Sequence, residues 1–370
     1  MPVTRLAPDE VLIPGWNRLS ASKIGAWNSC PRQYWMQYHL KIKEAMPPAV
    51  VRGIAVEACI SRVLRESPAL IKDDAPDRIL VSPLDEQGNL NEGVDGWLGP
   101  TLEGISENEL PQDFESLSNW AHSRIDAHVE RCTEEALISW LMSPHRVGDA
   151  EDLDREEVVA MAHRGIDLHL EEVMACHSNL SDDALNIWRK GGERANFPPP
   201  DGFPNIGTHI PPETKSGPIT WSEAWAIARP WFVDPDAPSF SMQTIHPDQW
   251  FQGEYDLVYR WDGRIRIIDL KASIGNNDRS RLYPEQLKMY AWLWWETHGR
   301  EEMVDGLEIW YLGPGYRKMI DAPIEAELVN MSTEMEEMYQ LLSSVSSEED
   351  TPLKPAPVAY FEGLVDLSTA

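Results

Sequence analysis

Two aspartates and a lysine, Asp256, Asp269 and Lys271, are spaced so that one β-hairpin would bring them together. They lie in residues 253–271, GEYDLVYRWDGRIRIIDLK, where both halves are rich in β-branched and aromatic residues. The dipeptide Asp262-Gly263 is typical of two-residue hairpin turns. Such a turn would place Asp256 directly opposite Asp269, and side-chain alternation would put both on one face with Lys271.

Opposed aspartates of this kind need a compensating cation. Like charges that face each other destabilise a strand pair, and the apolar run around Ile267 indicates a buried strand. The same register would place Glu254 opposite Lys271. A hard divalent metal ion bound through carboxylate oxygens is the expected cation. Two alternatives stay open, a solvated hairpin whose charges align by chance and a bulge that separates the two aspartates.

A helix with an aromatic face is predicted from Tyr283 onwards, in the sequence YPEQLKMYAWLW. Pro284 suits a first helical turn, and Gln286 and Tyr290 then lie on one face of the helix. An aromatic stripe at this spacing usually packs into a core. Because the helix follows the Asp-Leu-Lys strand after a short polar loop, we expect Gln286 and Tyr290 to lie near the carboxylates.

These motifs together resemble the RecB-like branch of the PD-(D/E)XK nuclease superfamily, which includes CRISPR-associated exonucleases and the nuclease domains of recombination helicase–nucleases. The motifs are Gly-x-x-Asp, then Asp-x-Lys thirteen residues after the first aspartate, then Gln-x-x-x-Tyr on a helix. The sequences LSASKI at 19–24 and CPRQY at 30–34 resemble the family's opening helices, and RGIAVE at 52–57 resembles its first active-site motif. The resemblance covers roughly residues 19–65 and 250–295.

The resemblance implies an α/β protein with a restriction-endonuclease-like core, in which a central mixed sheet is flanked by helices and carries a mostly helical insertion. It implies hydrolysis of DNA phosphodiester bonds that depends on Mg²⁺ or Mn²⁺, in DNA repair, recombination or foreign-DNA processing. DNA is then a partner, with a helicase or another repair protein as a second one. The alternative is a catalytically inactive nuclease fold that acts as a DNA-binding or scaffolding subunit.

The resemblance also implies a role for each site residue. Lys271 would orient the nucleophile or stabilise the transition state. Gln286 would position the phosphate or the lysine, and Tyr290 would brace Gln286 or contact the DNA backbone. The metal ligands would be the side chains of Asp256, Asp269 and Glu57, with the backbone carbonyl of Leu270 as a further ligand.

Two departures from the family pattern concern Glu57 and the cysteines. The family's first motif usually ends in histidine where this chain has Glu57, which can still bind Mg²⁺ or can be an ordinary helix residue. Many relatives hold an iron–sulfur cluster through one N-terminal and three C-terminal cysteines. This chain has Cys30 but no cysteine in residues 352–370, so we expect no iron–sulfur cluster. The remaining cysteines are expected to be small buried residues: Cys59, Cys132 and Cys176.

The chain of 370 residues has a formal charge of −29, which is unusual for a protein that binds phosphates. Its basic residues are concentrated where the motifs lie. Residues 1–65 carry nine basic and four acidic side chains, and residues 253–295 carry seven and six. The N-terminus has no signal-peptide pattern and no apolar run approaches a membrane span, so a cytoplasmic protein is expected.

Three regions are predicted along the chain. Residues 1–65 hold the N-terminal helices and first motif, residues 66–250 an acidic and mostly helical insertion, and residues 251–370 the nuclease core, its catalytic helix and a C-terminal tail. Further elements are predicted from hydrophobic periodicity, namely helices at 114–141, 153–179 and 325–343 and a strand at 306–312. Four histidines in the insertion lack carboxylates at metal-site spacing and are expected at helix surfaces or in the core: His122, His128, His163 and His169.

Overall fold

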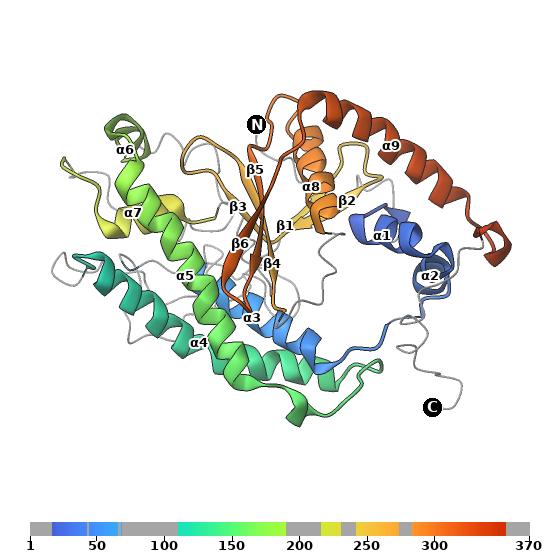
Figure 1. Cartoon of the computed structure of the whole chain (residues 1–370), viewed down its shortest axis with the longest axis horizontal. Coiled ribbons are helices and arrows are strands. Elements are labelled where there is room, and N and C mark those ends of the chain that lie inside the picture. Colours follow the sequence, from blue (N-terminus) through green and yellow to red (C-terminus); the bar gives the residue numbers. More distant parts are fainter. Residues whose placement is uncertain are drawn as a thin grey trace, which may run out of the picture.

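A computed structural model of the chain places its helices and strands around a four-stranded mixed β-sheet (Figure 1). No helix in the described part of the chain is long and apolar enough to cross a membrane. The structure describes residues 17–42, 44–65, 68, 110–189, 216–230, 242–273 and 283–352.

The sheet has the strand order β3-β4-β5-β6. The central strands β4 and β5 are parallel, and each outer strand is antiparallel to its neighbour. Two further strands, β1 and β2, form a separate antiparallel pair. The strand bounds are Met242–Ile245 for β1, Gln252–Tyr255 for β2, Leu257–Tyr259 for β3, Arg266–Lys271 for β4, Gly306–Tyr311 for β5 and Tyr316–Ile320 for β6.

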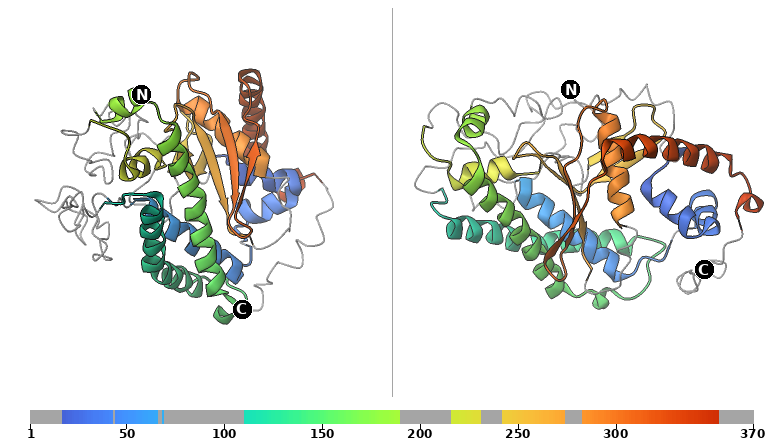
Figure 2. Two further views of the ribbon diagram at one scale, coloured as in Figure 1. Left: turned by 60° about the vertical axis from the view of Figure 1, so that its left-hand side comes forward. Right: turned by 45° about the horizontal axis from the view of Figure 1, so that its top comes forward.

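One face of the sheet packs against α1 (Ala21–Ser29), α8 (Tyr283–Thr297) and α9 (Glu325–Ser344). The sheet contributes Val258, Ile267 and Ile309 to this core, which also contains the apolar side of α8. The next elements after α1 are α2 (Pro31–Tyr34) and a π-helix at Trp35–His39. Figures 1 and 2 show α8 and α9 on one side of the sheet and α5 on the other.

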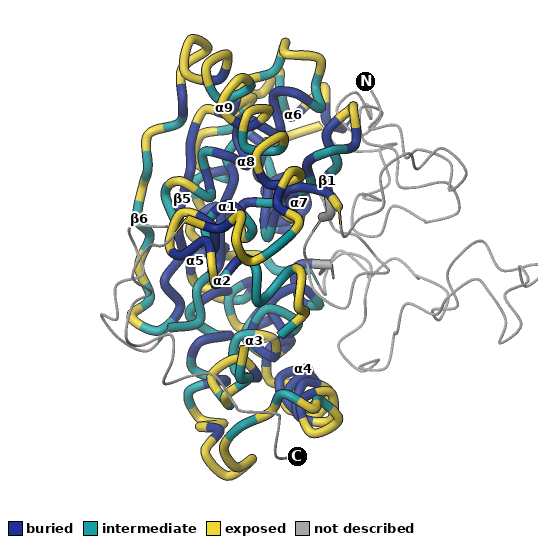
Figure 3. Tube along the Cα trace, turned by 90° about the vertical axis from the view of Figure 1, so that its right-hand side faces the viewer, coloured by how far each residue is buried: buried dark blue, intermediate teal, exposed yellow. Residues whose placement is uncertain are grey.

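The opposite face packs against a layer of helices that contributes most of the second core. The sheet adds Ile268, Leu270 and Trp310 to it, and α4 presents one buried and one exposed side (Figure 3). An added Cβ at Gly165 would lie 2.3 Å from Ile60 Cδ1, so this glycine permits the close contact of α5 with α3. The layer consists of α3 (Pro48–Arg65), α4 (Phe114–Leu141), α5 (Arg155–Asn179), α6 (Asp182–Arg189) and α7 (Trp221–Ala228).

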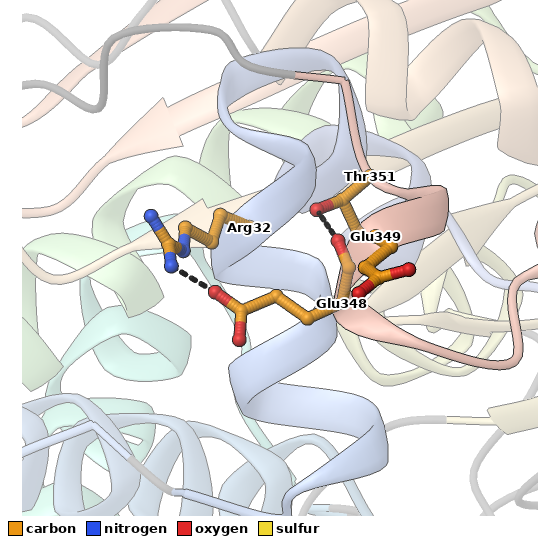
Figure 4. A pocket seen from close by; sticks show the side chains of 4 residues that line it. All are labelled: Arg32, Glu348, Glu349 and Thr351. Carbon is orange, nitrogen blue, oxygen red and sulfur yellow. Dashed lines mark hydrogen bonds and ion pairs between the residues drawn. The ribbon is translucent and has the colours of Figure 1, made fainter.

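The N-terminal and C-terminal parts of the described chain meet the core at two places. The backbone of Leu19 donates to Trp250 and accepts from Gln252, at 2.7 and 2.9 Å, which ties the start of the chain to β2. Arg32 on α2 forms an ion pair with Glu348, in a short 3₁₀-helix after α9. A surface hollow of about 370 Å³ lies beside this pair, lined by Arg32, Glu348, Glu349 and Thr351 (Figure 4).

The predicted α/β fold with a mixed sheet flanked by helices is confirmed. The helix at 114–141 has the predicted bounds, and the other predicted elements differ by one or two residues. The helix predicted from Leu153 begins at Arg155 because the side chain of Asp154 caps it by accepting from the backbone of Glu157. Most of residues 70–113 and 196–241, and the tail from 353, lie outside the described residues.

Candidate active site

The hairpin of β3 and β4 has the register that the sequence predicts. Its backbone partners are Leu257 with Ile268, Val258 with Ile267 and Tyr259 with Arg266. Gly263 in the connecting turn has a φ of +76°, a conformation that glycine adopts without strain. The paired strands end before this turn, so the connection is longer than the predicted two residues.

The prediction that residues 253–256 extend the same hairpin is wrong. Glu254 belongs to β2 and pairs with Gln243 of β1 instead of facing Lys271. Asp256 lies at a bend between β2 and β3. Its Oδ2 accepts a hydrogen bond of 2.7 Å from the backbone N–H of Leu270, which bonds this strand end to the Asp256 side chain. The bend therefore keeps Asp256 beside β4 and places Glu254 in the separate sheet of β1 and β2.

Asp269 and Lys271 lie on β4, on the face that packs against α8, since they alternate with the buried Ile267. Asp269 is 4% exposed. The Nζ of Lys271 lies 2.5 Å from Oδ2 of Asp269, and this oxygen has no well-aligned hydrogen-bond donor. The same ammonium lies 4.8 Å from the ring centroid of Tyr283, at the start of α8. Lys271 is therefore the cation that compensates Asp269.

Glu57 lies on α3, half-buried, and faces the charged end of β4. The helix is tied to that end because Nε of Arg52 donates to the backbone carbonyl of Ala272 at 3.3 Å. Burial raises the pKa of Glu57 to about 7, and the negative charges of Asp269 and Glu254 add to the rise while Lys271 opposes it. The structure thus places Glu57 of the first motif close enough to Asp269 and Lys271 of the hairpin for their charges to interact.

The two aspartates also have raised pKa values. Burial raises the pKa of Asp256 well above its ordinary value, and the charges of Asp269 and Glu57 raise it further. Burial likewise raises the pKa of Asp269, although Lys271 opposes this rise. Burial alone would lower the pKa of Lys271, but Asp269 and Asp256 overcome it and raise that pKa above its ordinary value. The carboxylates repel one another and each is stabilised by a nearby cation.

The helix α8 places Gln286 and Tyr290 next to this cluster. The Nε2 of Gln286 donates to the hydroxyl of Tyr290 at 2.9 Å. Burial raises the pKa of Tyr290 to about 12, and the charges of Asp256 and Asp269 contribute to that rise. Gly253 explains how β2 approaches this helix so closely, since a Cβ there would lie 3.1 Å from the Tyr290 ring and 2.8 Å from Leu293 Cδ2.

The donor chemistry of the cluster fits a hard divalent metal ion. Its donors are carboxylate oxygens, whose mutual repulsion such an ion would relieve. Within the described residues, however, no three His, Cys, Asp or Glu side chains are already gathered closely enough to hold a metal ion. Metal binding at Asp256, Asp269 and Glu57 would therefore require these carboxylates to draw together.

Two residues near the cluster had no role in the sequence prediction. Tyr283 faces the ammonium of Lys271, and Arg52 fixes α3 against the end of β4. Tyr283 is the first residue of α8, and its place directly before Pro284 is the one sign of it in the sequence. All four cysteines are buried and none forms a disulfide: Cys30, Cys59, Cys132 and Cys176.

Comparison with known proteins gives one match. The family model for the PD-(D/E)XK nuclease superfamily matches residues 18–138 and 162–357. The matched ranges include every residue of the cluster, from Glu57 on α3 to Tyr290 on α8. Neither the curated proteins nor the solved structures include a significant match.

Proposed function

We propose, because the chain belongs to the PD-(D/E)XK nuclease superfamily, that it is a metal-dependent deoxyribonuclease of the RecB-like branch. The observation that carries the proposal is the ion pair of buried Asp269 with half-buried Lys271, beside Asp256 at the end of β4. Buried carboxylates that repel one another cost stability. Their presence at the end of a central strand, in spite of this cost, favours a function that uses them.

In this proposal Asp256, Asp269 and Glu57 hold Mg²⁺ or Mn²⁺, with the Leu270 carbonyl as a further ligand. When bound, the ion would activate water and offset the negative charge that develops on the phosphate. Leu270 suits this position because its backbone N–H already bonds Asp256, which orients the peptide at the cluster.

The other residues act on the substrate and the nucleophile. Lys271 is positively charged at neutral pH because its pKa is raised, so its ammonium can stabilise the negative charge of the transition state. The phenol of Tyr290 stays protonated, since its pKa is raised to about 12, and it accepts from Gln286. This hydrogen bond holds the Gln286 side chain in place, where it would position the phosphate or Lys271.

DNA as the substrate is supported by the distribution of charge. The motif regions hold 16 of the 32 Lys and Arg residues of an acidic chain, which would direct a polyanion to the part of the protein that carries the motifs. A cytoplasmic role in DNA repair, recombination or foreign-DNA processing, with a helicase or other repair protein as partner, belongs to the same proposal.

The second candidate is a nuclease fold that binds DNA without cleaving it. Two observations favour it, namely Glu57 at the usual histidine position and the absence, among described residues, of three gathered ligands. Asp256 and the aspartate and lysine of β4 would then be remnants of an active site.

Cleavage assays separate the two candidates. We expect the purified protein to hydrolyse DNA with Mg²⁺ or Mn²⁺ and to lose this activity in EDTA. Single-stranded and double-stranded substrates, each with free and with blocked ends, would also define strand preference and the need for an end. Binding of the same DNA without cleavage, in either metal, would favour the non-catalytic candidate.

A further inference from the structure

Two histidines of neighbouring helices meet through their ring nitrogens, away from the carboxylate cluster. His122 on α4 and His163 on α5 have their Nδ1 atoms 2.6 Å apart. Their ring centroids are 4.9 Å apart and their planes differ by 29°. The centroid separation exceeds the Nδ1 separation by about one ring diameter, so the rings meet end to end and are not stacked face to face.

Each imidazole is held at its other nitrogen by an aspartate of the opposite helix. Nε2 of His122 lies 3.0 Å from Asp167 on α5, and Nε2 of His163 lies 2.9 Å from Asp126 on α4. A carboxylate accepts a hydrogen bond, so it favours the tautomer with the proton on Nε2. Both Nδ1 atoms then carry lone pairs that point at each other. This arrangement is stable only with a positive charge between them.

We propose that His122 and His163 bind a divalent transition-metal ion of the zinc and copper group through their Nδ1 atoms. Imidazole nitrogen is a preferred ligand of these metals. Metal-binding histidines commonly donate their second ring N–H to a carboxylate, which fixes the ring and makes the ligand more basic. Asp126 and Asp167 supply this feature on both sides of the pair.

The geometry allows such an ion with a small movement. Metal–nitrogen bonds of about 2.0–2.1 Å at a tetrahedral angle require the two nitrogens to separate to roughly 3.3 Å and the rings to rotate so that their lone pairs converge on the ion. The side chains of His122 and His163 are 28% and 26% exposed, so they have room to rotate and water can complete the coordination. Among the described residues, no group of three potential ligands is gathered. The two histidines are therefore the donors that the protein supplies to the ion.

The ion would join α4 to α5. Both helices pack against α3, which carries Glu57, in one continuous core. The donors of the histidine site are nitrogens, whereas those of the carboxylate cluster are oxygens, so the two sites would prefer different metals. The ion bound by the two histidines would therefore strengthen the helical layer behind the carboxylate cluster without taking part in the chemistry of that cluster.

The site is tested by letting the metal-stripped, full-length protein compete with a chromophoric chelator for Zn²⁺. In the Asp256→Asn protein, whose carboxylate cluster no longer holds a metal ion, we expect one equivalent of Zn²⁺ that is lost when His122→Gln or His163→Gln is added. Asp126→Asn and Asp167→Asn should weaken it by roughly 10- to 100-fold. His145→Gln, which changes a half-buried histidine outside the pair, is the matched control in the same Asp256→Asn background and should keep the bound Zn²⁺.

Electron paramagnetic resonance of the Cu²⁺-loaded protein gives an independent test. It should show coupling to two imidazole nitrogens, and each histidine variant should remove it. Circular dichroism of each variant reports its folding, and the two aspartate variants test the site if a histidine variant unfolds. Zn²⁺ binding that survives both histidine substitutions, or no Zn²⁺ binding tighter than about 1 mM, would mean that the pair holds only a shared proton.

Discussion

Substitution of Lys271 by alanine will lower the rate of DNA cleavage by roughly 10²- to 10³-fold, and Asp269→Asn will lower it at least as much. Lys271 is the charged group nearest the buried carboxylates, at 2.5 Å from Asp269. Its loss removes the ammonium that would stabilise negative charge at the phosphate. Asp269→Asn removes a proposed metal ligand. Steady-state cleavage of end-labelled DNA in Mg²⁺ measures both effects.

Two surface substitutions serve as matched controls. Lys318→Ala removes a half-buried lysine of β6, outside the motif regions, and Asp321→Asn removes an exposed carboxylate after β6. Both should cleave at the wild-type rate. All four variants should give the wild-type far-ultraviolet circular dichroism spectrum. Wild-type turnover by Lys271→Ala or Asp269→Asn, in preparations free of contaminating nuclease, would contradict the proposed roles.

Glu57 will make the metal-free protein less stable as pH rises from about 4.5 to about 7, and Glu57→Gln will remove this contribution. The pKa of Glu57 is raised in the folded protein to about 7, from an ordinary value of 4.5. The folded state therefore binds the proton more tightly than the unfolded state. This contribution to stability is fully present below pH 4.5 and is lost as pH rises through the folded pKa.

Thermal unfolding in EDTA at pH 5 and pH 8 measures the effect. Because Glu57 is only half-buried, we expect Glu57→Gln to gain about 1–2 kcal/mol over wild type at pH 8 and much less at pH 5. Glu285→Gln, an exposed carboxylate on α8, is the control and should behave as wild type at both values. An equal difference between Glu57→Gln and wild type at the two pH values would show that Glu57 does not titrate in this range.

The sequence predicted the β3–β4 register because alternation and turn chemistry act locally. Each paired position from Leu257 to Tyr259 lies where the Asp262-Gly263 turn places it. The helices at 114–141 and 325–344 were also predictable, since their apolar spacing is regular over many turns. Periodicity is most informative for elements of this length.

The parts that could not be predicted depend on contacts between distant residues. The bend at Asp256, which moves Glu254 into a second sheet, is fixed by the Leu270 N–H and by β1, whose sequence gives no sign of the pairing. The link from Arg52 to Ala272 and the pairing of His122 with His163 likewise join separate segments. The carboxylate beside each of these histidines comes from the opposite helix. Spacing along the chain could therefore not predict that the two histidines have carboxylate partners.

Calorimetric titration of Mn²⁺ into the metal-stripped protein, without DNA, tests most directly whether the carboxylate cluster is a metal site. Wild type, Asp256→Asn and Glu57→Gln are compared under the same conditions. We expect wild type to bind Mn²⁺, Asp256→Asn to lose most of that affinity, and Glu57→Gln to bind more weakly than wild type. The same Mn²⁺ affinity in wild type and Asp256→Asn would contradict the assignment of these carboxylates to a catalytic metal.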